Sequence, residues 1–276
     1  MEEVFWWAAY EGNVSRVRRI FKRNRNLDVN WKVSGTSDTA LSSACEEGRA
    51  TMMSLLLAHP DIDANSEDWW GSSPFLNACR GGRASCVRIL LRDSRVRVDQ
   101  LDQHGYSPLR CAADGGHLDV IKWWIASGRE MDLGQPRNLK TNAIAAAVAA
   151  SGRIVEGWLT PEEMEKKRKQ YVRVIHLLER FKENPEETRH EVRAEVGWYE
   201  ETAVHLFAVV VFASDGLLVP RRVTGDAPAA TRFFRIATQL PLELQMILCF
   251  RTRGLTREIM HGEESEVAFK ELSDRI

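Results

Sequence analysis

The hydrophobic and polar positions of the chain repeat from residue 8 onward. In four places a pair of small apolar residues lies just before a glycine, and these glycines are 36, 34 and 34 residues apart. The four copies are Ala8-Ala9 before Gly12, Ala44-Cys45 before Gly48, Ala78-Cys79 before Gly82, and Ala112-Ala113 before Gly116. One unit of this length cannot bury its own apolar face, so it must stack against a neighbour. The pattern predicts a stacked-repeat protein, which favours binding over catalysis and leaves the partner unnamed.

Each unit is predicted to hold two short helices and a turn. Ser73 and Ser107 each precede a proline that fits the first position of a helix, and Thr39 keeps the cap without the proline. The glycine of each copy can end the first helix in the left-handed conformation. Extended stretches then lead to turns, or fingers, whose tips carry Gly71 and Gly105. The second helices carry most of the core, with apolar residues three and four positions apart: Val87, Ile89, Leu90 and Leu91 in one unit, and Leu118, Val120, Ile121, Trp124 and Ile125 in the next.

Over roughly residues 4–182 these units resemble ankyrin repeats, whose pattern runs Gly-x-Thr-Pro-Leu-His, then Ala-Ala, then Gly-His. The stretch Gly116-His117-Leu118 matches that pattern best. The resemblance implies an all-α solenoid in which the fingers and first helices form a concave face for a protein partner. Leu76 and Arg110 stand where the family has a histidine that ties neighbouring turns together. We therefore expect those ties to be weakened and the array to be somewhat softened.

Two domains are expected. Residues 1–185 form an ankyrin array of about five units, and the fifth is irregular, with an insertion near 153–170. A helix with a capping box is predicted to start at Thr160-Pro161 and to run toward Phe181. After Asn184-Pro185 the period disappears, and a small helical C-terminal domain is expected over 186–276. Its helices are predicted at roughly 186–213, 229–239, 241–251 and 263–274, with a loop at 214–228.

Residues 240–248 read Leu-Pro-Leu-Glu-Leu-Gln-Met-Ile-Leu and resemble the opening of an F-box. The F-box is a short helical module that recruits a ubiquitin ligase core through a Skp-type adaptor. The resemblance implies that an adaptor-binding surface includes Leu240, Pro241, Leu244 and Ile247, and that the ankyrin face selects proteins for ubiquitination. The same pattern is also typical of any buried helix start, because proline at the first position and periodic leucines suit a packed helix.

The composition indicates which class of partner and which cellular compartment the protein has. The formal net charge of -1 argues against a general nucleic-acid binder, which needs a surplus of cations to displace counterions from phosphate. The longest apolar run, residues 203–213, is too short to cross a bilayer, which needs roughly 20 residues. The acidic start Met1-Glu2-Glu3 is unlike a signal peptide. Five cysteines without metal or disulfide spacing predict a reducing compartment. We expect a cytoplasmic protein, with the nucleus as the alternative location, and no membrane span.

The sequence holds none of the common catalytic patterns. Its seven histidines are dispersed, and neither a nucleophile elbow nor a phosphate-binding loop is present. His117 occupies a helix start that ankyrin repeats fill for structural reasons. Cys111, with His104 and His117 near it, could be a nucleophile, but a buried alanine-like position explains it better. We therefore expect no catalysis and no cofactor or metal.

Tryptophans mark the candidate binding site. Trp69 and Trp70 fall together before Gly71 on a finger, and Trp31 lies in a similar connection between the first two units. Exposed tryptophans are frequent at interface hot spots. The predicted partner-binding set is Trp31, Trp69, Trp70, His104 and Tyr106. The alternative is that one ring of the Trp69-Trp70 pair bridges adjacent fingers.

Two basic stretches have a structural and a functional interpretation. The second helix of the first unit carries six cations in ten residues, while Val17, Ile20 and Phe21 face inward. These cations could dock an acidic partner or nucleic acid, but a terminal repeat must in any case show a polar face to water. Residues 166–169 read Lys-Lys-Arg-Lys and are better explained as a solvated helix face.

Overall fold

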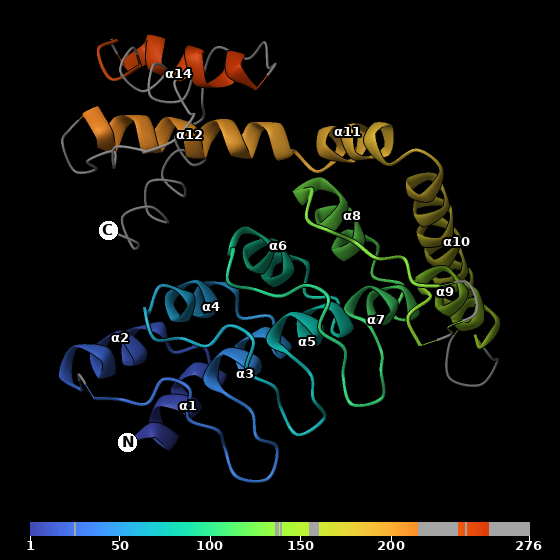
Figure 1. Ribbon diagram of the computed structural model, residues 1–276, viewed down its shortest axis with the longest axis horizontal. Coiled ribbons are helices and arrows are strands. Elements are labelled where there is room, and N and C mark those ends of the chain that lie inside the picture. Colours follow the sequence, from blue (N-terminus) through green and yellow to red (C-terminus); the bar gives the residue numbers. More distant parts are fainter. Residues whose placement is uncertain are drawn as a thin grey trace. The chain divides into compact units, whose positions relative to one another are not determined.

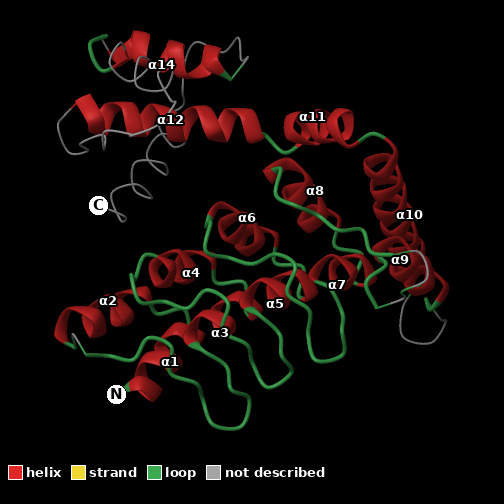
Figure 2. Ribbon diagram, viewed as in Figure 1, coloured by secondary structure: helices red, strands yellow, loops and turns green. Residues whose placement is uncertain are grey.

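The structure is a computed structural model, and it describes residues 1–24, 26–135, 138, 140–154, 160–214, 237–240 and 242–253. These residues contain thirteen helices and no strand (Figures 1 and 2). Contacts divide the chain into two compact units, Met1–Val192 and Arg193–Ile276. The first unit is a row of helix pairs, and the described residues of the second include two helices packed on each other.

The first unit alternates inner and outer helices, which are the first and second helices of each repeat. The inner helices are α1 (Glu2–Tyr10), α3 (Ala40–Glu46), α5 (Pro74–Arg80), α7 (Pro108–Asp114) and α9 (Ala143–Gly152). The outer helices are α2 (Val14–Arg23), α4 (Ala50–Leu57), α6 (Ala84–Arg92), α8 (Leu118–Ser127) and α10 (Pro161–Glu183). Each inner helix packs on the next inner helix and each outer helix on the next outer helix. Figure 1 shows the inner helices in one row, with the fingers projecting beyond them.

The predicted helix starts and ends of these repeats are confirmed. The Oγ atoms of Thr39, Ser73 and Ser107 accept hydrogen bonds from backbone N–H groups three residues later, at 3.1, 3.3 and 3.3 Å. The glycines after α3, α5 and α7 have φ values of 72°, 66° and 69°. At Gly82 a side chain is also excluded by space, because a Cβ there would lie 2.4 Å from Nδ1 of His117. The turn between the helices therefore depends on glycine for both conformation and room.

The core lies between the inner and outer rows. The small pairs of the inner helices, Ala44-Cys45, Ala78-Cys79 and Ala112-Ala113, are completely buried, which lets successive helices approach closely. The outer helices fill the space behind them, and Phe75 meets Trp124 edge to face with ring centroids 4.9 Å apart. All five cysteines are buried and free, as expected for core residues.

Neighbouring repeats are tied together by groups other than the histidine of the ankyrin pattern. Asn30 donates to Asp61 O at 2.7 Å and accepts from the backbone N–H of Asp63 at 2.8 Å. Asn65 repeats this arrangement one unit later, with Arg95 O at 2.8 Å and the N–H of Arg97 at 2.7 Å. The two asparagines thus join successive connections, so the absence of the family's histidine does not leave the repeats without polar ties. The softening of the array stays a prediction.

The fifth unit keeps the two-helix plan with a longer connection. Helix α9 is capped by Asn142, and α10 starts with the predicted capping box, in which Thr160 and Glu163 bond each other's backbone N–H groups. Helix α10 runs to Glu183, and residues 155–159 within the expected insertion lie outside the described residues. The hydroxyl of Tyr171 donates to Asp114 O at 2.9 Å, which joins α10 to the end of α7.

The helix predicted over 186–213 is wrong in one respect, because it is two helices. Helix α11 (Pro185–Glu195) and helix α12 (Trp198–Ser214) are separated at Gly197, whose φ of 68° interrupts a helical path. The helix predicted at 241–251 is confirmed as α14 (Leu242–Thr252), which packs on α12 around Phe207 and Phe250. The predicted helix 263–274 and most of the segments 214–228 and 229–239 lie outside the described residues.

Among the described helices, none alone has the length and apolar character needed to cross a bilayer; α11 and α12 taken as a bent pair meet the length and composition criteria.

Candidate functional site

A groove of about 500 Å³ opens along the inner helices α3, α5 and α7. Two fingers border it, residues 66–73 between α4 and α5 and residues 100–107 between α6 and α7. The fingers contribute Asp68, Trp70, Asp102, His104 and Tyr106 to its lining. The other lining residues come from the inner helices and the turn after α7: Glu46, Asn77, Arg80, Arg110, Cys111, Asp114 and Gly115.

A buried aspartate shapes each of these fingers. Oδ1 of Asp68 accepts hydrogen bonds from the backbone N–H groups of Trp70 at 2.9 Å and Ser72 at 2.8 Å. Oδ1 of Asp102 does the same for His104 and Tyr106, both at 2.9 Å. Each carboxylate therefore folds the finger around itself, as an Asx turn does. The backbone fixes where the side chains at the fingertip are presented.

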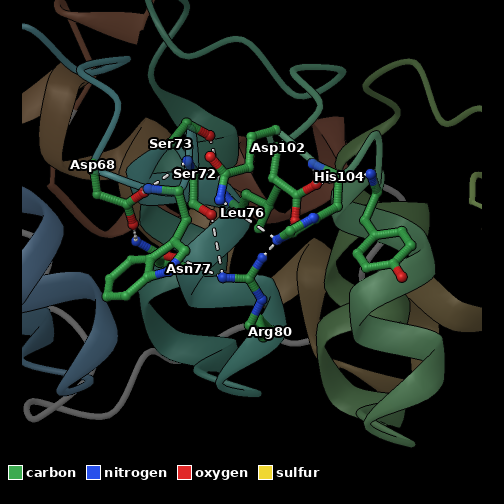
Figure 3. A network of polar contacts seen from close by, with 11 residues as sticks. Asp68, Ser72, Ser73, Leu76, Asn77, Arg80, Asp102 and His104 are labelled. Atoms are coloured by element: carbon green, nitrogen blue, oxygen red, sulfur yellow. Dashed lines mark hydrogen bonds and ion pairs between the residues drawn. The ribbon is translucent and has the colours of Figure 1, made fainter.

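The second oxygens of these aspartates connect the two fingers through α5 (Figure 3). Oδ2 of Asp68 accepts from Asn77 Nδ2 at 2.9 Å, and Oδ2 of Asp102 accepts from Arg80 at 2.9 Å. Arg80 also donates to Asn77 Oδ1 at 3.3 Å and to Ser72 Oγ at 3.2 Å. One continuous polar network therefore holds both fingers against the same inner helix.

Backbone hydrogen bonds join consecutive fingers at their tips. The N–H of Trp69 donates to Thr36 O at 2.9 Å, and the N–H of Gln103 donates to Trp70 O at 3.0 Å. Gly71 has a φ of 71°, and a Cβ there would lie 3.0 Å from the Gln103 nitrogen. The main chain of the two tryptophans thus links this finger to the connection that carries Thr36 and to the finger of residues 100–107. These bonds do not use the tryptophan rings.

The structure brings three of the five predicted partner-binding residues together. Trp70, His104 and Tyr106 line the groove, and the Trp70 side chain is 46% exposed. Trp69 is 67% exposed on the same finger without lining the groove. Trp31 is half-buried and does not line the groove. The Arg110 guanidinium lies 4.0 Å from the centroid of the Tyr106 ring, so this ring is partly covered within the chain.

Two aromatic residues that belong to the same surface were missed by the sequence reasoning. Trp7 and Tyr10 of α1 are 49% and 38% exposed. Tyr10 occupies the position of Glu46, Arg80 and Asp114 in later repeats, because these residues are 36, 34 and 34 positions apart, like the glycines. Since all three later residues line the groove, the Tyr10 position continues the groove surface onto α1. The signal was present in the sequence, where the four copies align.

The rings of α1 also contact one another. Trp6 stacks on Tyr10 with centroids 5.4 Å apart, and Trp7 meets both rings edge-on at 5.1 and 5.7 Å. Trp6 is almost wholly buried. The exposed rings of Trp7 and Tyr10 therefore rest on a fixed support, which reduces the side-chain entropy that binding would cost.

Several carboxylates act on one another around Glu46 on α3, the inner helix between the α1 rings and the finger that carries Trp70. Burial raises the pKa of the Glu46 carboxyl, and the negative charges of Asp38, Glu47 and Asp68 raise it further, against the opposing effect of Arg80. The pKa of Asp38 is also raised, mainly by burial; a hydrogen bond with the Thr36 side chain opposes this, and the charge of Asp68 adds to it. Within the part of the chain that the structure describes, no hydrogen bond or ion pair involves the Glu46 carboxylate.

The properties of Cys111, the potential nucleophile in the groove, and of His117, a potential base outside it, do not favour catalysis. Burial raises the pKa of the Cys111 thiol, although Arg80 and Arg110 lower it, so the thiol form is favoured. Nε2 of His117 lies 3.0 Å from Arg80 O, and burial lowers the pKa of this imidazole. The ring thus links two repeats, which supports the structural interpretation. Among the described residues no group of three His, Cys, Asp or Glu side chains could hold a metal ion.

The predicted adaptor-binding residues belong to the second unit. Leu240 and Ile247 are half-buried, and Leu244 is 48% exposed beside Leu242 at 55%. Pro241 lies outside the described residues. The leucines at the start of α14 therefore point to solvent, while its later residues contribute to the core with α12.

Comparison with known proteins identifies the repeats. The family model described as "Ankyrin repeats (3 copies)" matches residues 5–93 and 60–137. A search of curated proteins gave no match, and the comparisons do not support the F-box-like resemblance of residues 240–248. Ankyrin repeats are generally modules for protein–protein interaction. The all-α repeat fold predicted from the sequence is confirmed, and residues 5–137 are an array of ankyrin repeats.

Proposed function

We propose that this protein is a non-catalytic interaction protein whose partner binds along the groove between the inner helices and the fingers. The observation that carries the proposal is the exposure of Trp69 and Trp70 on a finger whose backbone is fixed by Asp68. Because the finger is rigid, its two exposed rings can be removed from water only when another molecule covers them. Covering them is favourable, since apolar surface leaves water.

The size of this effect is sufficient for a binding hot spot. Two tryptophans exposed by about half leave on the order of 200 Å² of ring surface to be covered. At about 25 cal/mol per Å² this corresponds to roughly 5 kcal/mol before the costs of association are subtracted. Even if less than half of it survives, removing the rings weakens binding by about tenfold or more.

The test is affinity capture from a cell extract with the full chain, in which Trp69→Ser with Trp70→Ser is compared with the wild type. Val172→Ser on α10 is a matched control, because Val172 is also strongly exposed but lies on an outer helix. We expect the double variant to keep its melting temperature and to lose captured proteins, while the control loses none. Equal capture by a stable double variant would overturn the proposal. The rival hypothesis, an enzyme with an unrecognised site, predicts turnover that survives these changes.

The second candidate function is recruitment of a ubiquitin ligase through a Skp-type adaptor at α14. The exposed side chains of Leu242 and Leu244 support it, because an adaptor needs apolar residues that are not committed to the core. Leu244→Ser should abolish co-purification with a Skp-type adaptor and leave thermal unfolding unchanged. The control Phe250→Ala removes a buried ring and should lower stability by about 3–5 kcal/mol. Absence of the adaptor from the wild-type complex would rule out this function.

A further inference from the structure

The exposed rings of the array form two clusters on the same surface. Trp7 and Tyr10 lie on α1 in the first repeat, and Trp70 borders the groove on the finger of residues 66–73. Glu46 occupies the intervening inner helix, α3, and lines the groove together with Trp70. A partner that covers both aromatic clusters must therefore pass over Glu46.

The charges along this surface are unevenly satisfied. Toward the C-terminal end, Arg80 pairs with Asp102, Asp114 pairs with Arg153, and Arg110 lies on the Tyr106 ring. On α3 the Glu46 carboxylate has no partner among the described residues. The carboxylates of Asp38, Glu47 and Asp68 act on it electrostatically, against Arg80. The Arg83 guanidinium is engaged at the end of the same helix, where it donates to Glu46 O at 2.7 Å. Four carboxylates thus outnumber the two arginines around Glu46, and one of these arginines, Arg80, is already paired with Asp102. A further cation can relieve the remaining repulsion there.

We propose that the occupant of this surface is a basic peptide segment of a partner protein, with an Arg or Lys side chain against Glu46 and Asp38 and apolar side chains on the Tyr10 and Trp70 rings. The inference rests on the proposed function and specifies the chemistry of its partner. The neighbouring rings strengthen the choice of a cation, because an Arg or Lys beside the face of Trp or Tyr gains a cation–π contribution.

The repeat geometry sets the spacing of the recognised residues. Packed helices lie about 8–10 Å apart, and an extended chain advances about 3.3 Å per residue. One repeat therefore corresponds to about three residues of bound peptide. The recognised segment has an apolar residue, then a basic residue about three positions away, with a second apolar side chain near the basic one to cover Trp70.

An acidic partner fits this surface poorly, since it would bring further negative charge to four carboxylates. The array offers such a partner another place, the outward face of α2, where Arg16, Arg19, Lys22 and Arg23 are exposed. A ligand of the groove is therefore expected to be basic and a ligand of α2 acidic. Selecting peptides that bind the protein can distinguish the two.

The experiment selects twelve-residue random peptides displayed on phage against the full chain. Enriched peptides are synthesised with a fluorescein label, and their affinity is measured by fluorescence anisotropy. We expect the enriched sequences to share an Arg or Lys with an apolar residue about three positions away. Glu46→Gln and Tyr10→Ser should each weaken these peptides by about tenfold, while Val172→Ser leaves affinity unchanged. Glu46→Lys should invert the preference and favour peptides in which Glu replaces the basic residue.

The outcomes separate this inference from the proposed function. Enriched peptides that are neutral or acidic, yet depend on Trp70, would overturn the basic-segment inference and keep the groove as the binding site. Acidic peptides that depend on Arg19 and Lys22 would move the site to α2 and overturn both. Selection that returns no peptide binding the wild-type chain, or peptides indifferent to Trp70 and Tyr10, would also overturn both.

Discussion

The two halves of the groove surface differ in whether their charged side chains are paired within the chain. In the third and fourth repeats, Arg80, Asp102 and Asp114 are joined to one another or to neighbouring elements, and the fingers are fixed by those contacts. In the first and second repeats, Glu46 has no partner among the described residues, and the rings of Trp7 and Tyr10 are exposed. The same repeat fold therefore has one half whose polar groups pair within the chain, and another half that we propose to be completed by a partner.

The largest effect is expected in the half whose polar groups pair within the chain. Asp102→Ala removes the buried carboxylate that holds Arg80 and two backbone N–H groups, so it should lower the free energy of unfolding by about 3 kcal/mol or more. Asp102→Asn keeps an acceptor for the backbone and should cost less. Asp38→Asn, in the other half, should not destabilise the array. Urea denaturation of the three variants measures this difference, and equal losses at positions 38 and 102 would contradict it.

An intermediate effect is expected on the pH dependence of peptide binding. Because the pKa values of Glu46 and Asp38 are raised, these carboxyls take up protons earlier than ordinary ones as the pH falls. Their attraction for an Arg side chain therefore weakens as the pH falls, and the affinity should be lower at pH 5 than at pH 7. Anisotropy titrations at both pH values measure this change. The double variant Glu46→Gln with Asp38→Asn should bind weakly and equally at both pH values; a pH dependence that persists in this variant would contradict the role of these two carboxyls.

The smallest effect is expected on stability at Glu46. Its folded-state pKa is raised, which means that the folded array favours the neutral carboxyl. This group therefore stabilises the array at low pH and loses that contribution as the pH rises through its pKa. At pH 7, Glu46→Gln should raise the melting temperature slightly. The gain in the free energy of unfolding should not exceed about 0.5 kcal/mol, because the Glu46 side chain is largely exposed and its burial is only partial. A marked destabilisation would show that Glu46 has a structural role.

The features predicted correctly from the sequence depend on local chemistry. A serine before a proline, or a glycine after a run of small residues, determines a helix start or end within a few positions, and the structure confirms these at Ser73, Ser107 and Gly82. Gly197 carried the same kind of signal, and overlooking it merged two helices into one.

The candidate site was predicted less completely, because it depends on alignment between repeats and on distance in space. Asp68 and Asp102 each precede a fingertip glycine by three residues, a pattern that could have been read. Aligning Tyr10 with Arg80 would have placed it on the groove surface. The raised pKa of Glu46 could not be predicted from the sequence, since it arises from burial and from charges on different elements. Trp31 resembles the fingertip tryptophans in sequence but not in exposure, which depends on how its connection packs.

The Asx turn at Asp68 separates the shape of the finger from its recognition chemistry. Within the finger, Oδ1 of Asp68 bonds only the main chain of positions 70 and 72, and the backbone bonds to neighbouring fingers use only the main chain of positions 69 and 70. Neither set depends on which side chains occupy positions 69 and 70. Those two positions are therefore open to replacement without rebuilding the loop, so a library randomised there offers a route to arrays with new binding specificities on an unchanged scaffold.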